Sequence, residues 1–172
     1  MDYAEVTDIT PDIRLTFYNA GHILGSALVH LHIGEGWHNL LYTGDFKTTD
    51  TKLLTKADED LPEIDYLITE STYSDREHAD RKSQEKELVR IINDTISNEG
   101  IVLVSGFAVG RIQELLLVLD KYGIDYPLYI DGMAKKATTI INQYASLLKE
   151  PRSLDKALQK VKYVSSERHR KQ

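Results

Sequence analysis

The sequence predicts an α/β protein whose first part is rich in strands and whose second part alternates helices with strands. In the first 75 residues, apolar and polar side chains alternate over several stretches, which is the pattern of half-buried strands. From about residue 76, stretches with a helical spacing of apolar residues alternate with short apolar runs. That order is typical of a parallel sheet with crossover helices. Of the 172 residues, 41% are hydrophobic, which is enough for a buried core and argues against a disordered chain.

Four strands are predicted in the first part. Residues 13–18 and 27–33 alternate apolar with polar side chains, and the glycine-rich stretch 34–36 follows as a hairpin turn would. A third strand fits residues 38–43, and a shorter apolar strand fits residues 66–69. This region is therefore expected to be mainly β.

Three helices are predicted in the second part, because apolar residues recur at helical spacing within 88–96, 112–119 and 133–148. Residues 101–104 have the composition of a buried strand, and a further short strand fits residues 128–130. These elements supply the helix–strand alternation on which the α/β prediction depends.

A polar run at residues 74–80 marks the change of pattern and is the best candidate for a boundary. We therefore expect two regions, 1–75 and 76–172. At roughly 150 residues per domain, the length favours one core or two halves that depend on each other.

Composition excludes several classes of protein. The chain has no cysteine, so disulfides and zinc sites built on thiolates are excluded, and only nitrogen and oxygen ligands remain for a metal. No apolar run approaches the roughly 20 residues needed to cross a bilayer, and the first residues do not form a signal peptide. We expect a soluble, cytoplasmic protein without membrane contact.

Three segments each place a metal-capable side chain directly after a predicted strand. They are AGHILGS with His22, YTGDF with Asp45 and TESTY with Glu70. Strand ends are places where a rigid scaffold can aim side chains into a shared pocket. A single His or Asp at a turn is more often a cap or a satisfied polar group, so the prediction of a site depends on the three segments together.

A second set of residues is suited to binding phosphate. Residues 105–113 read as a strand end, a small-residue loop with Gly106 and Gly110, and a helix start with Arg111. Backbone N–H groups and the dipole of a helix start favour anions, and an arginine adds a bidentate contact. The alternative is that residues 107–109 only pack the turn. The spacing excludes a Walker loop and a dinucleotide-binding fingerprint.

The net charge of −6 hides a basic C-terminal segment. Residues 149–172 hold 8 basic and 3 acidic residues of the 21 and 27 in the chain. Contact with a polyanion depends on local clusters, so the acidic total does not exclude RNA or DNA. The segment reads as a short helix and a strand near 161–164, and its cations either track the phosphates of a single strand or form a solvated face. These cations are Lys156, Lys160, Lys162, Arg168, Arg170 and Lys171.

In their order and in their residues, the three strand-end segments together with VSGFAVGRIQE and YIDGM resemble the β-CASP ribonucleases of the metallo-β-lactamase superfamily. Within that branch the sequence is most similar to the archaeal cleavage and polyadenylation specificity factor family, related to endonucleases of mRNA 3′-end processing. The resemblance implies that 1–75 is the C-terminal part of a metallo-β-lactamase β-rich layer and 76–172 a parallel-sheet β-CASP half-domain. It implies a zinc-dependent ribonuclease acting on single-stranded RNA, as endonuclease or exonuclease.

By position, the resemblance implies that His22 binds one zinc, that Asp45 bridges two zincs, and that Glu70 acts as an acid or orienting group. Asp45 and Glu70 are thus the catalytic candidates, and His22 and Asp45 the metal ligands. Two divalent ions about 3.5 to 4 Å apart can activate a shared water and stabilise both oxygens of a phosphodiester, and a carboxylate can bridge them. A neutral imidazole suits zinc.

The family's principal HxHxDH motif and two later histidines have no counterpart in the sequence. We therefore expect a fragment of a longer enzyme that binds zinc weakly or not at all and does not cleave RNA alone. His30 and His32 are expected to be a solvent-facing pair in a hairpin rather than the missing motif. A sheet without its earlier strands exposes an edge and an apolar face, so we also expect a homodimer.

Two other functions stay open at this point. One is a non-catalytic module for RNA binding or assembly. The other is a small-molecule metallohydrolase, which shares the zinc segments but should lack the stretches 107–114 and 131–133.

Overall fold

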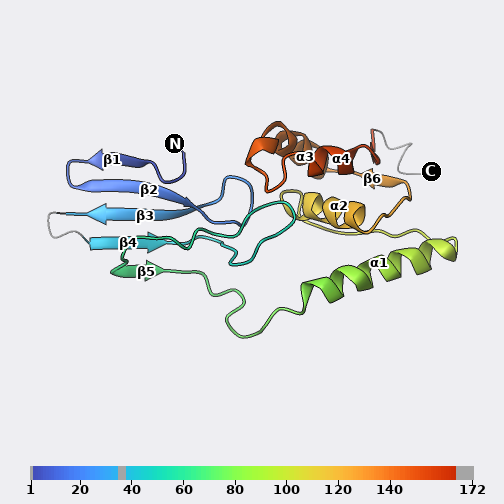
Figure 1. Ribbon diagram of the computed structural model, residues 1–172, viewed down its shortest axis with the longest axis horizontal. Coiled ribbons are helices and arrows are strands. Elements are labelled where there is room, and N and C mark those ends of the chain that lie inside the picture. Colours follow the sequence, from blue (N-terminus) through green and yellow to red (C-terminus); the bar gives the residue numbers. More distant parts are fainter. Residues whose placement is uncertain (1, 35–37, 166–172) are drawn as a thin grey trace. The chain divides into compact units, whose positions relative to one another are not determined.

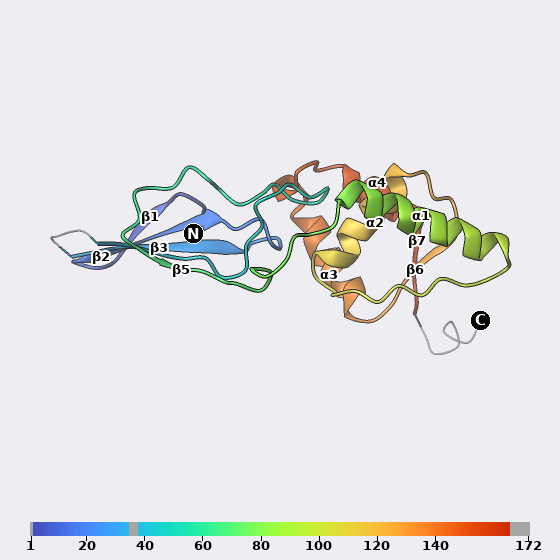
Figure 2. The same cartoon turned by 90° about the horizontal axis from the view of Figure 1, so that it is seen from below.

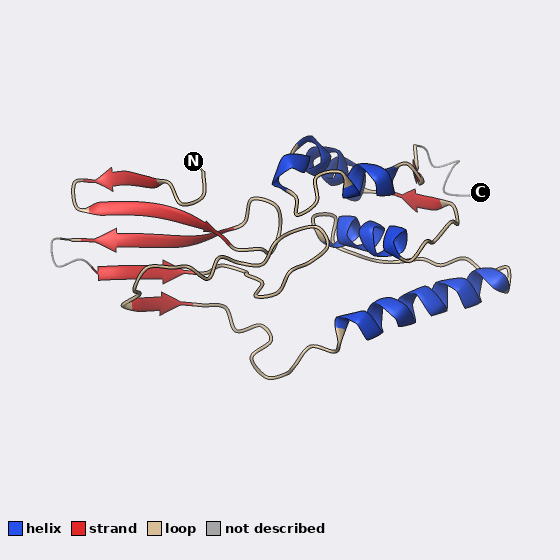
Figure 3. Ribbon diagram, viewed as in Figure 1, coloured by secondary structure: helices blue, strands red, loops and turns tan. Residues whose placement is uncertain are grey.

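The computed structural model describes residues 2–34 and 38–165 (Figure 1). It divides into two compact units, Met1–Ser74 and Asp75–Gln172, which are treated separately below. The first unit is a sheet with long loops, and the second combines helices with two short strands (Figure 3). The secondary structure is thus mixed α/β, as predicted. Within the described residues, no helix has the length and apolar content needed to cross a membrane.

The first unit is built on a five-stranded sheet in the order β1-β2-β3-β4-β5. The first four strands are antiparallel neighbours, and β5 runs parallel to β4. The four predicted strands are confirmed to within about a residue, but β1 was not predicted. The strands are β1 Val6–Thr10, β2 Ile13–Asn19, β3 Ala27–Ile33, β4 His38–Tyr42 and β5 Tyr66–Ile68.

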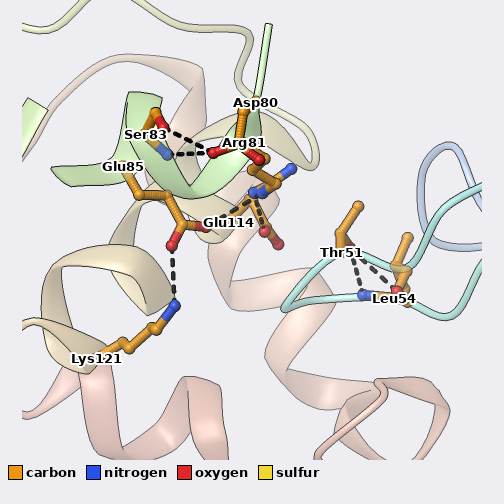
Figure 4. A network of polar contacts seen from close by, with 8 residues as sticks. All are labelled: Thr51, Leu54, Asp80, Arg81, Ser83, Glu85, Glu114 and Lys121. Carbon is orange, nitrogen blue, oxygen red and sulfur yellow. Dashed lines mark hydrogen bonds and ion pairs between the residues drawn. The ribbon is translucent and has the colours of Figure 1, made fainter. Parts of the chain in front are cut away.

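One face of this sheet forms the core of the first unit. Leu28 and Leu41 are buried there together with Ala20, and Phe46 and Ile64 pack against them. The covering residues come from the long connection between β4 and β5, which turns back on itself where the Leu54 backbone N–H donates to the Thr51 hydroxyl at 2.8 Å (Figure 4). This connection therefore acts as the second layer of the unit.

The prediction that His30 and His32 face solvent was wrong. His30 is only 6% exposed, because it lies on the same face of β3 as Leu28 and opposite the buried Leu41 of β4. The Asn39 side chain satisfies both rings, since its Oδ1 lies 3.1 Å from His30 Nε2 and 2.7 Å from His32 Nδ1. A buried polar group needs such a partner. The pair is therefore part of the sheet's interior face.

The second unit contains three longer helices, one short helix and a two-stranded parallel sheet of β6 and β7 (Figure 2). The helices predicted within 88–96 and 112–119 and the strand at 128–130 are confirmed, whereas the helix predicted within 133–148 ends at Gln143 and is followed by a 3-10 turn. The elements are α1 Arg81–Ser97, α2 Arg111–Lys121, β6 Leu128–Ile130, α3 Met133–Gln143, the 3-10 turn η1 Ala145–Leu147, α4 Ser153–Leu158 and β7 Val161–Tyr163.

One part of the core of the second unit lies between α1 and α2. Ile92 of α1 and Leu119 of α2 are buried together with Ile124, and Leu88 and Leu115 pack against them. These are the apolar positions whose spacing predicted the two helices. Burial of one face of each helix is what stabilises them in this unit.

The predicted buried strand at 101–104 was wrong. The structure assigns no strand to these residues, and Ile101 and Leu103 are 90% and 95% exposed. An apolar run predicts burial only if a neighbouring strand pairs with it, and the described residues supply none at this position.

Candidate functional site

The loop that carries His22 is held by hydrogen bonds to a serine at its end. The Ser26 hydroxyl accepts from the backbone N–H groups of His22 and Ile23, each at 3.2 Å. The Tyr3 hydroxyl donates to the Ser26 carbonyl at 2.9 Å, which ties the loop to the N-terminal segment. Both ends of AGHILGS are therefore fixed, and the exposed His22 side chain projects from a defined backbone.

Gly21 lets this loop approach the β4–β5 connection closely. Its φ is +66°, and a Cβ at this position would lie 2.6 Å from the Ala57 backbone nitrogen. Only glycine fits such a contact without displacing backbone. The Asn19 side chain supports the approach, because it accepts from the Gly21 N–H at 2.9 Å and donates to the Lys56 carbonyl at 2.9 Å.

Thr43 joins the ends of β4 and β5. Its buried hydroxyl donates to the Gly44 carbonyl at 2.8 Å and accepts from the Glu70 backbone N–H at 3.3 Å. The parallel pairing of the two strands places Asp45 and Glu70 after neighbouring strand ends. Thr43 was not among the predicted site residues, and a threonine next to a glycine gives no pattern by which to find it.

The structure brings the three predicted strand-end residues together. His22 Nε2 lies 3.8 Å from Asp45 Oδ2, and the Glu70 backbone N–H is hydrogen-bonded to Thr43, two residues before Asp45. Hydrogen bonding to Thr72 holds the pKa of Glu70 below its usual value, with smaller contributions from the Phe46 backbone and from His22. Glu70 is thus stabilised as a carboxylate beside the other two groups.

These residues fit part of a zinc site. The separation of 3.8 Å is shorter than about 4.2 Å, the sum of typical Zn–N and Zn–O distances, so the imidazole of His22 and a carboxylate oxygen of Asp45 can reach one ion. A catalytic zinc has three protein ligands. Across residues 2–34 and 38–165, no group of three or more His, Cys, Asp or Glu side chains is arranged to hold a metal.

The predicted phosphate-binding loop lies in the second unit, directly before α2. Gly110 is the N-terminal cap of α2 with φ +78°, a conformation that favours glycine. Ser105, Gly106, Phe107 and Arg111 line an open hollow in front of the helix start. Phe107 is 83% exposed, so it does not pack the turn as the alternative interpretation required.

A charged network fixes α1 against α2 close to this loop (Figure 4). Arg81 contacts the carboxylates of both Glu85 and Glu114, and Lys121 donates to Glu85 at 3.0 Å. Both glutamates are 7% exposed, and buried carboxylates need such cationic partners. Glu114 lies in the first turn of α2, so the network anchors the helix at the end that carries Arg111.

The described lysines of the basic segment make intramolecular contacts. Lys156 pairs with Asp120 at 3.2 Å, Lys160 lies 3.7 Å from Asp125, and Lys162 lies over the Tyr129 ring at 5.8 Å. Arg168, Arg170 and Lys171 lie outside the described residues. The helix and the strand predicted for this segment are confirmed as α4 and β7.

Comparison with known proteins relates the chain to transcription termination factors. It is 49% identical over 154 residues to the transcription termination factor FttA of Pyrococcus horikoshii, a match covering 86% of this chain and 24% of the relative. The chain is homologous to part of FttA. Identity to the FttA of Methanothermobacter thermautotrophicus is 53% over 147 residues, covering 81% of the chain and 23% of the relative. No protein-family model matches the chain.

The similarity to FttA includes both units, because neither unit alone is as long as the matched 147 to 154 residues. The FttA of Methanocaldococcus jannaschii matches over 86% of the chain at 47% identity. In each case the chain spans about a quarter of the length of the FttA protein that it matches.

Proposed function

We propose that the chain forms part of a zinc-dependent ribonuclease of the β-CASP type, which hydrolyses RNA phosphodiester bonds during transcription termination or RNA 3′-end formation. The observation that carries this proposal is the convergence of His22, Asp45 and Glu70, which follow three separate strands, since His22 pairs with Asp45 and Glu70 is bonded to Thr43 beside it. The similarity to transcription termination factors supports a part in transcription termination.

In this proposal His22 and Asp45 would hold zinc through the imidazole and a carboxylate oxygen. Zinc, when bound, would lower the pKa of a water molecule and stabilise the charge on the reacting phosphate. The carboxylate of Asp45 would also supply an oxygen to a second ion, as two-metal hydrolytic sites require. Glu70, whose carboxylate accepts from the Thr72 backbone N–H at 3.3 Å, orients the attacking water or accepts its proton.

Metal binding by the 172-residue chain tests the site directly. Co²⁺ is a spectroscopic substitute for zinc, and we expect weak binding that is lost in His22→Ala and in Asp45→Ala. The matched controls are His38→Ala and Asp60→Ala, two exposed residues of the same unit. Equal Co²⁺ affinity in all four variants would show that the two residues do not bind the metal.

Cleavage requires the remaining ligands, so it is best measured in a chimera. The chain would replace the matching segment of the Methanothermobacter thermautotrophicus relative, to which it is 53% identical. We expect zinc-dependent cleavage of single-stranded RNA that Asp45→Asn abolishes and Asp60→Asn leaves intact. A chimera that folds and binds zinc but cleaves no RNA would contradict the proposed reaction.

A non-catalytic RNA-binding or assembly module is the second candidate. Two observations favour it. The described residues contain no group of three or more side chains arranged to hold a metal, and the apolar side chains of Leu103 and Phe107 are exposed. In this case the hollow with Arg111 would bind phosphates, and Arg111→Ala would weaken RNA binding for all sequences alike. Titration of labelled single-stranded RNA into the chain, with and without Arg111→Ala, tests this module.

A further inference from the structure

Gln113 is a fully buried amide at the start of α2. It is 0% exposed, and its Nε2 donates to the Ala108 carbonyl at 3.0 Å and to the Thr138 hydroxyl at 2.7 Å. Its Oε1 is buried and has no hydrogen-bond partner among the described residues. A buried amide with an unsatisfied oxygen is unfavourable for stability, and an apolar side chain would avoid this penalty. The two donated bonds therefore point to a role other than filling the core.

These two bonds connect three parts of the second unit. Gln113 belongs to α2, Thr138 is a fully buried residue of α3, and Ala108 lies in the loop before α2. The single side chain of Gln113 thus fixes the loop to both helices.

The backbone hydrogen bond that the described part of this loop makes within itself is local, from the Arg111 N–H to the Val109 carbonyl at 3.0 Å. The side chains that flank Ala108 point outward, since Phe107 is 83% exposed and Val109 is 44% exposed. Gly110 has a positive φ of +78°, and a glycine can adopt many other backbone conformations when nothing restrains it. The bond from Gln113 to the Ala108 carbonyl is the interior contact that selects one of them.

We propose that Gln113 and Thr138 are positioning residues, which set the shape of the hollow lined by Ser105, Gly106 and Arg111 and so determine its affinity for a phosphodiester. The inference rests on the proposed RNA binding and adds the groups that arrange the binding loop. Neither residue touches the ligand, because both side chains are fully buried. Their effect is transmitted through the Ala108 carbonyl and the backbone between it and Arg111.

The experiment compares matched substitutions in the 172-residue chain. Gln113→Met removes the amide at similar length, and Gln143→Met is its exposed control on α3. Thr138→Val removes only the hydroxyl, Thr138→Ser keeps it, and Thr139→Val is the exposed neighbour. For each, we would measure the affinity for labelled oligouridylate, the hydrogen exchange of loop amides by NMR, and the melting temperature.

We expect Gln113→Met and Thr138→Val to weaken oligouridylate binding by up to about tenfold, the equivalent of one net hydrogen bond. Thr138→Ser should restore affinity, which a role in packing alone does not explain. In Gln113→Met the loop amide of Arg111, which donates to the Val109 carbonyl at 3.0 Å, should exchange faster, while the amides of α1 stay protected.

Two failures are distinguishable. If the unaltered chain binds no oligouridylate, the proposed RNA binding fails. If the loop amides of Gln113→Met exchange at the unaltered rate, or if RNA affinity is unchanged in both Gln113→Met and Thr138→Val, the positioning role is overturned. The same holds if Thr138→Ser binds RNA as weakly as Thr138→Val.

Discussion

The hydroxyl of Thr43 accepts a hydrogen bond from the backbone N–H of Glu70 at 3.3 Å, across the open ends of two parallel strands. The two residues are 27 positions apart in sequence. This contact holds the residues after β4 beside those after β5, which is where Asp45 and Glu70 lie.

Replacing Thr43 with valine should therefore destabilise the first unit. The substitution keeps the shape but leaves the Gly44 carbonyl and the Glu70 N–H without their partner, so we expect a loss of about 1–3 kcal/mol. Urea unfolding measures the difference. Thr48→Val is the control, because Thr48 is exposed and its substitution should change stability by less than about 0.5 kcal/mol. Equal unfolding midpoints for the two variants would show that the Thr43 contact contributes nothing.

Substituting two glycines of the His22 loop distinguishes the energetic cost of backbone strain from the cost of a steric clash. Gly21 and Gly25 both have positive φ, but only at Gly21 would a Cβ meet backbone atoms. Gly25→Ala should cost about 1 kcal/mol, and Gly21→Ala distinctly more, because the loop must also move away from Ala57. Thermal unfolding of the two variants checks the order. A Gly21→Ala protein as stable as Gly25→Ala would contradict the close approach.

Stability should fall in mildly acidic solution because of His30. Burial lowers the pKa of this histidine, so the unfolded chain binds a proton at higher pH than the folded chain does. The stabilisation is complete above about pH 6.5, the unperturbed value, and is lost as the pH falls towards the lower folded pKa. His30→Leu should flatten this pH dependence, whereas His38→Leu, an exposed control, should preserve it. Urea unfolding between pH 5 and 8 measures both, and a slope unchanged by His30→Leu would exclude this histidine as the cause.

Two arginines of α1 should differ strongly in their contribution to stability. Arg81→Met removes the cation shared by the buried Glu85 and Glu114, and we expect a loss of about 2 kcal/mol, discounted because Arg81 itself is partly exposed. Arg90→Met breaks only exposed pairs on the same helix and should cost less than about 1 kcal/mol. Chemical unfolding compares them, and a larger loss for Arg90→Met would reverse the interpretation.

Self-association should proceed through the edge strand β5. All three of its residues are more than half exposed, and among residues 2–34 and 38–165 no strand pairs with one of its edges. Leu67→Lys should weaken dimerisation in sedimentation velocity, since a charged residue protects an exposed edge. Val6→Lys, on the strand at the opposite edge, is the control. A chain that stays monomeric at high concentration would contradict the expected homodimer.

The alternating segments were predictable because each of them is a half-buried strand with a neighbour on both sides. Strands β2 and β3 meet that condition, and both were found. Strand β1 was missed because it lies at an edge, is largely exposed and has an irregularity between Asp8 and Thr10. The strand predicted at 101–104 is absent, because its apolar composition indicates a strand but the described residues provide no neighbouring strand to pair with it.

The metal-capable residues of the candidate site could be predicted from the sequence, but the residues that position them could not. His22, Asp45 and Glu70 could be named because metal-capable side chains after strand ends are conspicuous in a sequence. Thr43 and Gln113 could not, because an uncharged polar residue acquires its role only from what the fold places beside it.

The parallel pairing of β4 and β5 also sets an order of events during folding. Strands β1 to β4 are joined by short turns, so their contacts are local in sequence and form quickly. Strand β5 can pair with β4 only after the chain between Tyr42 and Tyr66 has closed into a loop, which has a higher entropic barrier. We therefore expect His22 to lie in the part of the sheet that assembles early, and Asp45 and Glu70 to join it only when the connection between β4 and β5 has closed, so the cluster is complete only in the fully folded unit.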